Sequence, residues 1–232
     1  NSTDSSVQRI KDWIKENTFT GKFISQQEPR TICQNLNEAL KHTNGKYFIG
    51  ISCDDLLTQD KTLKQVELFE KLSQDYALIY SDTEIINENN QVIRNSFIDK
   101  LGMNKDELNR INYYDELMKR NFIPAMSGLV RTEYVKSIGG YDENLQAEDH
   151  DMWLRLSKKY KFYYLDCIAA QYRLHSNNLH KELKKKMHEK RYAIFIKHYH
   201  HPTAKEKVLK SIDFLLKNYG SKHSEVIDFI KL

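Results

Sequence analysis

The chain has 232 residues, enough for one domain or for one domain with an appendage. Its 36 Lys and Arg residues nearly balance 32 Asp and Glu residues, and the net charge of +4 does not indicate a nucleic-acid-binding protein. Cys33, Cys53 and Cys167 lie too far apart for a disulfide framework or a zinc motif, which favours a reducing, cytoplasmic setting. No apolar run approaches the roughly 20 residues of a membrane span, so the composition is that of an ordered globular protein.

Helices and strands are expected to alternate along most of the chain. The first helix carries Ile10, Trp13 and Ile14 at helical spacing, and Ser5 with Gln8 has the pattern of a capping box at its start. Further helices are expected over residues 31–42, 62–72, 113–120, 132–138 and 148–158. Strands are expected over residues 22–25, 47–51, 76–80, 127–130 and 162–168, with a hairpin over 84–94. This alternation predicts an α/β fold.

From residue 180 onward the pattern is helical and basic. A basic helix is expected around residues 181–191, and Val208, Leu209 and Ile212 predict a further amphipathic helix. These helices either pack onto the rest of the chain or attach it to an anionic membrane surface. His198, His200 and His201 form a cluster in the sequence, but without neighbouring Cys or acidic ligands they do not indicate a metal site.

Two adjacent carboxylates, Asp54 and Asp55, follow the expected strand over residues 47–51. Ligands of α/β folds bind beyond the carboxyl ends of the strands, and ionised carboxylates are costly to bury. Two hard oxygen ligands at such a place suit Mg²⁺ or Mn²⁺, and through the cation a diphosphate. A turn that caps the next helix has the same residues, so both interpretations stand at this point.

A second acidic pair, Glu148 and Asp149, stands at the start of an expected helix. The helix dipole favours carboxylates there, and a carboxylate held in that place also suits a general base. Later in the chain, Arg173 and His175 follow the expected strand over residues 162–168. Such a pair is able to meet phosphate oxygens or a metal, although a single His is more often an ordinary surface or core residue.

In their order and spacing these stretches resemble family 2 glycosyltransferases of the GT-A fold. The matching motifs are Asn-Ser-Thr-Asp at 1–4, Leu-Asn-Glu-Ala-Leu at 36–40, Gly-Lys-Tyr-Phe-Ile at 45–49, Ser-Cys-Asp-Asp at 52–55, Ile-Gly-Gly-Tyr-Asp-Glu at 138–143, Glu-Asp-His-Asp-Met-Trp-Leu-Arg at 148–155 and Tyr-Arg-Leu-His at 172–175. Each motif alone is a weak signal. All of them in family order are a specific one.

The resemblance implies a GT-A catalytic domain over residues 1–179 and a helical, basic extension over residues 180–232. The catalytic domain is expected to have a mixed, mostly parallel, Rossmann-like sheet flanked by helices. The expected reaction is a metal-dependent, inverting transfer of a sugar from a nucleotide-diphosphate donor to a carbohydrate or lipid-linked acceptor. The Gln-x-x-Arg-Trp motif of processive synthases is absent, so one sugar is expected per encounter.

The resemblance also assigns roles to residues of this chain. Asp149 is expected to be the general base, with Glu148 and Trp153 at the acceptor. The other expected roles are donor binding by Asp54, Asp55, Asn37 and Arg173, and coordination of Mg²⁺ or Mn²⁺ by Asp55, Asp54 and His175. The expected biological role is the synthesis of cell-surface polysaccharide or glycolipid in the bacterial envelope, with no nucleic-acid partner and with peripheral contact at the inner face of the membrane.

Two departures from the family pattern are visible. Ser52 stands where the family has the first Asp of its metal motif, and a hydroxyl adds no charge for a cation. The family's first strand would also precede Asn1, so we expect this chain to be a segment of a longer protein. Both departures leave open an alternative function as a non-catalytic module that binds a nucleotide sugar or a carbohydrate.

Overall fold

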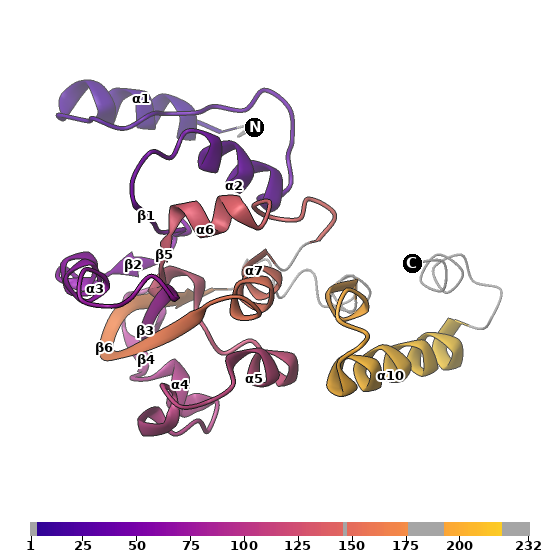
Figure 1. Ribbon diagram of the computed structural model, residues 1–232. Helices are drawn as coiled ribbons and strands as arrows, with labels where there is room; N and C mark the ends of the chain where they lie inside the picture. Colours follow the sequence, from indigo (N-terminus) through magenta and orange to yellow (C-terminus); the bar gives the residue numbers. More distant parts are fainter. Residues whose placement is uncertain (1–3, 146–147, 176–192, 220–232) are drawn as a thin grey trace.

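A mixed β-sheet with helices on both faces forms the body of the protein (Figure 1). The computed structural model describes residues 4–145, 148–175 and 193–219. The strands are β1 (Tyr47–Phe48), β2 (Leu56–Leu57), β3 (Tyr76–Asn87), β4 (Val92–Arg94), β5 (Leu129–Arg131) and β6 (Lys161–Leu174). The helices are α1 (Ser6–Glu16), α2 (Ile32–Lys41), α3 (Lys61–Phe69), α4 (Phe97–Lys100), α5 (Tyr113–Lys119), α6 (Thr132–Ser137), α7 (Glu148–Ser157) and α10 (Pro202–Tyr219), with short 3₁₀ turns η1 (Lys105–Glu107) and η2 (Ala125–Ser127).

The strand order in the sheet is β1-β5-β3-β6-β2, and β4 also pairs with β3. β3 and β6 are parallel from Tyr76 opposite Lys161 to Asn87 opposite Leu174. The other four pairings of the described strands are antiparallel. The sheet is therefore mixed, as predicted, but the expectation of a mostly parallel sheet is wrong for these strands. The reason is the position of β5, which runs between β1 and β3 in the opposite direction to both.

Alternate residues of β3 face two different apolar layers, as the two-residue period of a strand requires. Leu78 and Tyr80 are fully buried in the main core beneath α5 and α7. Ile79 points to the other face, where it packs with Phe69 of α3. Both faces of the central strand are thus covered by helices, which explains why its sequence is a continuous apolar run.

Most of the predicted elements are present, and the differences have local causes. The capping box at Ser5 is not formed, whereas Thr31 and Gln34 form one at the start of α2. Residues 22–25 are not a strand. β3 extends past its apolar run because Asp82, although only 1% exposed, accepts hydrogen bonds from the backbone N–H groups of Phe97 and Ile98. A satisfied buried carboxylate allows the strand to continue.

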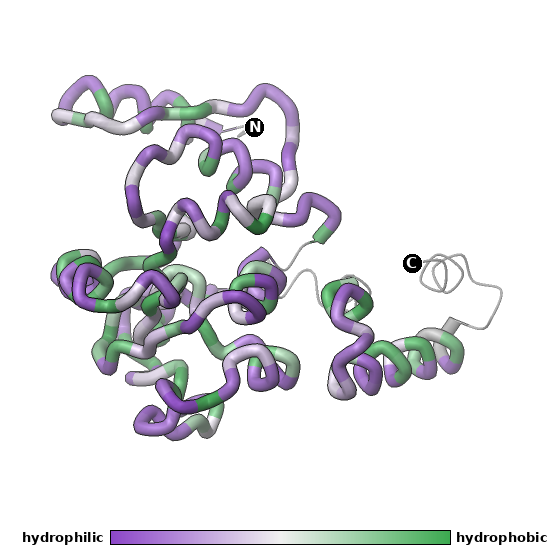
Figure 2. The backbone as a smooth tube through the Cα atoms, in the orientation of Figure 1, coloured by the Kyte–Doolittle hydropathy of each residue, from purple (hydrophilic) through white to green (hydrophobic). Residues whose placement is uncertain are grey.

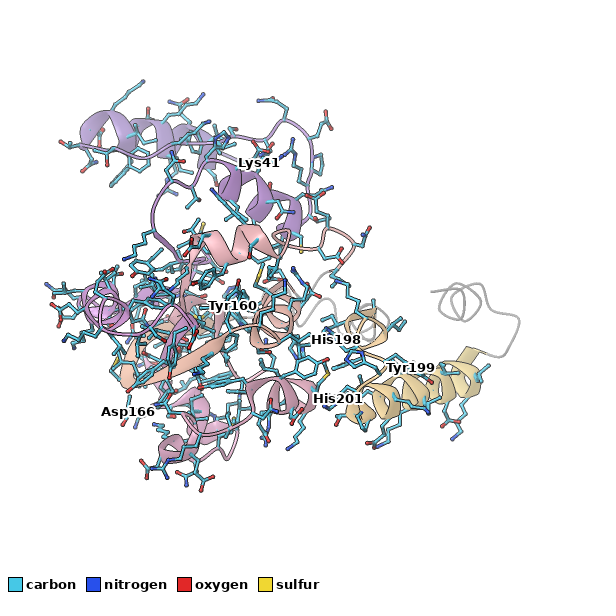
Figure 3. All side chains as sticks on the ribbon, in the orientation of Figure 1. Lys41, Tyr160, Asp166, His198, Tyr199 and His201 are labelled. Carbon is cyan, nitrogen blue, oxygen red and sulfur yellow. The ribbon has the colours of Figure 1, made fainter. Side chains whose placement is uncertain are left out.

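In the C-terminal helix α10, polar and apolar residues alternate along the chain, as predicted (Figure 2), and the helix contacts α5. Ala204 and Val208 are buried there, and the Lys207 Nζ donates 2.8 Å to the carbonyl of Lys119 on α5. His198 and His201 lie against α5, where His201 contacts Asp115 (Figure 3). Within the described ranges no three His, Cys, Asp or Glu residues are placed to hold a metal. The predicted basic helix around residues 181–191 lies outside the described residues.

None of the described helices combines the length and the apolar character needed to cross a lipid bilayer.

Candidate active site

Residues that are about 120 positions apart in the sequence meet where the C-terminal end of β6 reaches the loop after β1. The backbone N–H of Arg173 donates 2.9 Å to Asp55 Oδ1, and His175 Nε2 lies 3.0 Å from Asp54 Oδ2. The predicted strand over 162–168 would have stopped short of this contact, but β6 continues to Leu174 and carries both residues to it. The structure therefore brings Asp54, Asp55, Arg173 and His175 together, as the sequence predicted.

The guanidinium group of Arg173 holds backbone at this end of the sheet. Its Nε donates 2.7 Å to the carbonyl oxygen of Asp54, and its Nη1 donates 3.0 Å to that of Asn87. The loop with the two carboxylates is thereby tied to both β6 and β3. Arg173 orders the site by these contacts, which is a different task from the donor contact expected for it.

Asp55 is the more deeply buried of the two carboxylates, with 6% of its surface exposed. Burial raises the pKa of Asp55 to about 6, and the neighbouring charge of Asp54 adds to that effect, while the N–H of Arg173 opposes it. A cation beside Asp55 would stabilise the ionised form of its carboxyl group. Mg²⁺ in proteins commonly takes one or two carboxylates and completes its coordination with water and substrate phosphates. Asp54 and Asp55 supply two carboxylates of that kind, and within the described part of the chain no third His, Cys, Asp or Glu is placed to share a metal position with them.

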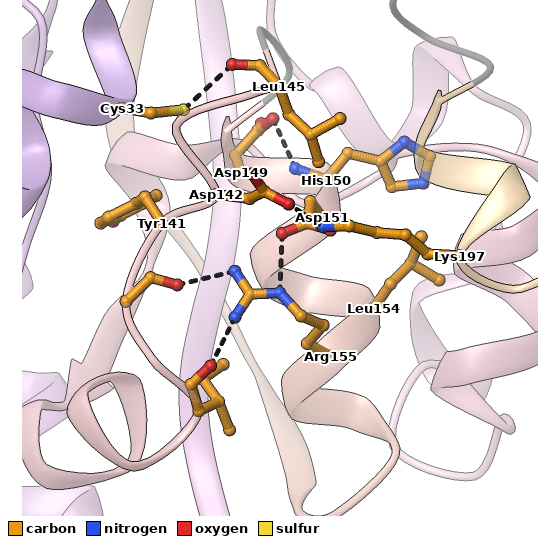
Figure 4. A network of polar contacts seen from close by, with 12 residues as sticks. Cys33, Tyr141, Asp142, Leu145, Asp149, His150, Asp151, Leu154, Arg155 and Lys197 are labelled. Atoms are coloured by element: carbon orange, nitrogen blue, oxygen red, sulfur yellow. Dashed lines mark hydrogen bonds and ion pairs between the residues drawn. The ribbon is translucent and has the colours of Figure 1, made fainter. Parts of the chain in front are cut away.

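The second acidic pair begins α7. Asp149 Oδ1 accepts a 2.6 Å hydrogen bond from the N–H of His150, and its Oδ2 accepts one of 2.9 Å from the amide of Asn121 (Figure 4 shows the first of these). Burial raises the pKa of Glu148 to about 7, and the charge of Asp149 adds to that effect. At neutral pH the Glu148 carboxyl group beside Asp149 is therefore only partly ionised.

A buried ion-pair network fixes the position of α7. The guanidinium of Arg155 donates 2.7 Å to Asp151 Oδ2 and also binds the backbone carbonyls of Ile138 and Gly140 (Figure 4). Lys197, from the C-terminal part of the chain, lies 2.9 Å from Asp151 Oδ1. The last Asp and the Arg of the Glu-Asp-His-Asp-Met-Trp-Leu-Arg motif are therefore structural, and they orient the helix whose first residues are acidic.

Tyr172 on β6 connects the two acidic pairs electrostatically. Burial raises its pKa to about 12, and the charges of Asp55, Asp54 and Asp149 each add to the effect. One phenol thus lies within electrostatic range of both pairs. The predicted donor site and the predicted base consequently belong to one region of the molecule.

Two residues expected at the site serve the fold instead. The Asn37 amide donates 2.8 Å to the carbonyl of Tyr141 and accepts 2.8 Å from its N–H. It fastens a turn in which Gly140 has a φ of +72°, where an added Cβ would lie 2.7 Å from Asn37 Oδ1. A donor contact by Asn37 is not what this geometry shows, because both ends of its amide are already engaged.

Trp153 is the second of these two residues that serve the fold. Only 4% of it is exposed, and its indole N–H donates 3.3 Å to the carbonyl of Ile123 within the main core. The expected contact between Trp153 and an acceptor is therefore wrong for this structure. A large aromatic residue at the inner face of an amphipathic helix more often fills a core than binds a ligand.

Asn121 is the residue at this site that the sequence did not indicate. It precedes the buried pair Phe122 and Ile123 in a segment without clear periodicity. No local signal marks an amide that contacts a carboxylate 28 residues later, and only the packing of α7 against residues 121–128 reveals it.

Comparison with protein families settles the relationship of the chain. Residues 1–224 match the model of the glycosyltransferase-like family 2. The chain belongs to this family. The sequence resemblance stated above is thereby confirmed.

Related glycosyltransferases occur in Rickettsia. One of Rickettsia bellii is 28% identical over 149 residues, which are 64% of this chain and 21% of the relative. One of Rickettsia felis is 25% identical over 179 residues, which are 77% of this chain and 29% of the relative. The chain thus spans less than a third of the length of these curated relatives.

Solved structures share the GT-A-like fold at low sequence identity. The mannosyltransferase PcManGT of Pyrobaculum calidifontis, in complex with GDP-Man and Mn²⁺, has a TM-score of 0.61 at 11% identity over 99% of this chain and 67% of that one. S. aureus TarS has a TM-score of 0.57 at 12% identity over 95% of this chain and 37% of that one. The expected fold class, a mixed α/β sheet flanked by helices, is confirmed by these likenesses.

Proposed function

We propose that this family 2 member transfers one sugar from a nucleotide-diphosphate donor to an acceptor hydroxyl, with inversion at the anomeric carbon. The observation that carries the proposal is that Tyr172 lies within electrostatic range of Asp54 and Asp55 and also of Asp149, so that the two acidic pairs belong to one region. One pair is joined to His175 and suits a cation, and the other begins a helix and suits proton transfer.

On the donor side, Asp54 and Asp55 are the residues that would hold Mg²⁺ or Mn²⁺, and His175 lies beside Asp54. The bound cation supplies neutralisation of the charge that develops on the departing diphosphate. Arg173 keeps the two carboxylates in place through its bonds to backbone at Asp54 and Asn87. The mannosyltransferase with the same fold, in complex with GDP-Man and Mn²⁺, supports this class of donor and cation.

On the acceptor side, Asp149 takes the proton of the attacking hydroxyl. The hydroxyl oxygen then forms a bond to the anomeric carbon while the bond from that carbon to the diphosphate oxygen breaks. The products are the glycosylated acceptor, the nucleoside diphosphate and a protonated Asp149. Glu148 lies beside Asp149 and would contact the acceptor in this proposal, and its raised pKa of about 7 would allow it to donate a hydrogen bond.

The experiment is a screen of UDP-, GDP- and dTDP-sugars with Mn²⁺, in which release of the nucleoside diphosphate is measured. We expect turnover of at least one donor and a loss of about 10³-fold or more in Asp149→Asn, since the base is removed. Asp166→Asn, at an exposed carboxylate of β6 that accepts a hydrogen bond from Tyr164, is the matched control and should retain full turnover. Unchanged turnover in Asp149→Asn would remove Asp149 as the base.

A non-catalytic nucleotide-sugar-binding module is the second candidate. Ser52 favours it, because this exposed residue stands where the family has a carboxylate and leaves the cation with fewer charged ligands. Such a module would bind UDP or GDP with Mn²⁺ by calorimetry but release no diphosphate from any donor. Restoring the carboxylate with Ser52→Asp would then raise cation affinity without creating turnover.

The C-terminal extension is proposed to hold the protein at the inner face of an anionic membrane, near a lipid-linked acceptor used in cell-surface polysaccharide or glycolipid synthesis. Residues 180–232 contain 13 basic and 6 acidic residues, a net charge of +7, whereas the rest of the chain has a net charge of −3. On the outer side of α10, Leu209 and Leu216 are 50% and 39% exposed. Basic residues beside an exposed apolar stripe are the pattern of a helix that lies on a lipid surface.

A further inference from the structure

Residues 121–128 form a segment that is fixed between α3 and α7. Two buried side chains of α3, Lys61 and Gln65, donate hydrogen bonds of 3.1 and 2.8 Å to backbone carbonyls near its end. The buried indole of Trp153 on α7 donates 3.3 Å to a carbonyl near its start. Because the segment is bonded to both helices, its first residue has a defined position relative to α7.

That first residue is Asn121, and its side chain contacts the proposed base. Asn121 Nδ2 donates 2.9 Å to Asp149 Oδ2, while the other carboxylate oxygen accepts the N–H of His150 at 2.6 Å. Each oxygen of Asp149 therefore has one donor from the protein. An ionised carboxylate has about four lone-pair sites, so acceptor capacity remains for a substrate hydroxyl.

We propose that Asn121 is a positioning residue for Asp149: its amide fixes the orientation of the carboxylate and stabilises the ionised form that takes the acceptor proton. The inference rests on the proposed function, in which Asp149 is the base. A hydrogen bond to the charged form of a carboxyl group favours that form. The bond is of particular use here because Glu148, directly beside Asp149, disfavours a second negative charge.

Titratable groups near Asp149 come from α7, from the turn before it and from β6. Glu148 lies on α7 itself, Tyr141 precedes it, and Tyr172 belongs to β6. Burial raises the pKa of both phenols, that of Tyr172 to about 12, so neither ionises near neutral pH. Glu148 is thus a neighbour whose charge changes near neutral pH, whereas Asn121 is a neutral donor whose effect is constant across that range.

The first test needs no substrate. The full chain is labelled with ¹³C at the Asp carboxyl groups, the Asp149 signal is assigned with Asp149→Asn, and its titration is followed by NMR in wild type, Asn121→Ala and Asn121→Asp. We expect the titration midpoint in Asn121→Ala to move up by about one pH unit, the size of one lost bond to a charged group. Asn121→Asp should move it further, because a like charge replaces the donor.

The second test uses the donor that gives the highest release of nucleoside diphosphate in the screen. In Asn121→Ala we expect kcat to fall about tenfold with little change in the KM for the donor, and the acidic limb of kcat/KM to move to higher pH. Asn109→Ala is the matched control, since Asn109 bonds only to the backbone of Tyr164 in the contacts described. It should lower stability without moving the acidic limb.

An unchanged midpoint in both Asn121 variants would overturn the inference, as would a fall in kcat with an unmoved acidic limb. If wild type turns over no donor, the proposed function has failed, and the NMR midpoint still decides the role of Asn121. If Asn121→Ala does not fold, the nearly isosteric Asn121→Asp provides the same comparison.

Discussion

At the scale of single residues, the cost of keeping Asp55 buried near Asp54 decides how the site responds to pH. The unfolded chain ionises Asp55 near its ordinary pKa of 3.8, whereas the folded protein holds its pKa at about 6. Between these values the folded state binds more protons than the unfolded state. Stability is therefore fully present below about pH 4 and is lost as the pH rises through about 6.

Asp55→Asn should remove this loss. Asn keeps an oxygen that accepts the N–H of Arg173, but it cannot ionise. Between pH 4 and pH 7.5 the free energy of unfolding should therefore decrease by about 2 kcal/mol less in Asp55→Asn than in wild type. Urea unfolding at a series of pH values measures the difference. Asp54→Asn removes the neighbouring charge but leaves Asp55 able to ionise, so it should retain most of the loss, because burial is the larger cause of the raised pKa of Asp55. An identical pH dependence in wild type and Asp55→Asn would contradict the assignment of the loss to Asp55.

At the scale of the elements, a buried polar cluster joins α3 to the sheet. Lys61 Nζ lies 2.7 Å from Gln65 Oε1, and the Gln65 amide donates to the carbonyl of Ser127 at 2.8 Å and to the hydroxyl of Ser81 at 3.3 Å. Burial lowers the pKa of Lys61 to about 8. Because every group in the cluster is shielded from water, one lost side chain leaves several partners unsatisfied.

Gln65→Leu should therefore destabilise the protein by about 3 kcal/mol, since it removes the acceptor of a buried ammonium and the donor to a buried carbonyl. Equilibrium urea unfolding followed by tryptophan fluorescence measures the change. Gln8→Leu on α1, where the glutamine side chain is exposed, is the matched control and should change stability by less than about 0.5 kcal/mol. Equal stability of the two variants would show that the cluster contributes little.

Local sequence pattern predicts the positions of the helices better than the lengths of the strands. Helical spacing located α2, α3, α5, α6 and α7 to within a few residues, because the period of 3.6 is a property of each segment by itself. The apolar runs of the sequence predict strands that are shorter than β3 and β6. Both strands continue through polar residues that only a neighbouring strand or a buried hydrogen bond makes tolerable, and β6 thereby delivers Arg173 to the site.

At the scale of the whole molecule, the charge asymmetry of the chain predicts salt-dependent binding to anionic vesicles. Co-sedimentation with vesicles containing phosphatidylserine should retain the protein at low salt and release most of it at 0.5 M NaCl, because screening weakens the attraction of the +7 extension. Vesicles of phosphatidylcholine alone should retain little. Leu209→Asp with Leu216→Asp should reduce binding about tenfold, since the exposed apolar stripe of α10 is lost.

The matched control for the vesicle experiment is Leu63→Asp, an exposed leucine on α3 in the catalytic part of the chain. It changes the same kind of residue on another surface and should leave vesicle binding unchanged. Binding of wild type that is equal on both kinds of vesicle, or insensitive to salt, would contradict an electrostatic attachment.

The sequence by itself determined the family and the α/β class, because motif order and local periodicity are written in short segments. The tertiary structure decided what each side chain touches. It turned Asn37 and Trp153 into supports of the fold and placed Asn121 against Asp149. It also set β5 antiparallel between β1 and β3. These outcomes depend on contacts between distant segments, which are selected by packing and by the need to satisfy buried polar groups, and no local pattern carries that information.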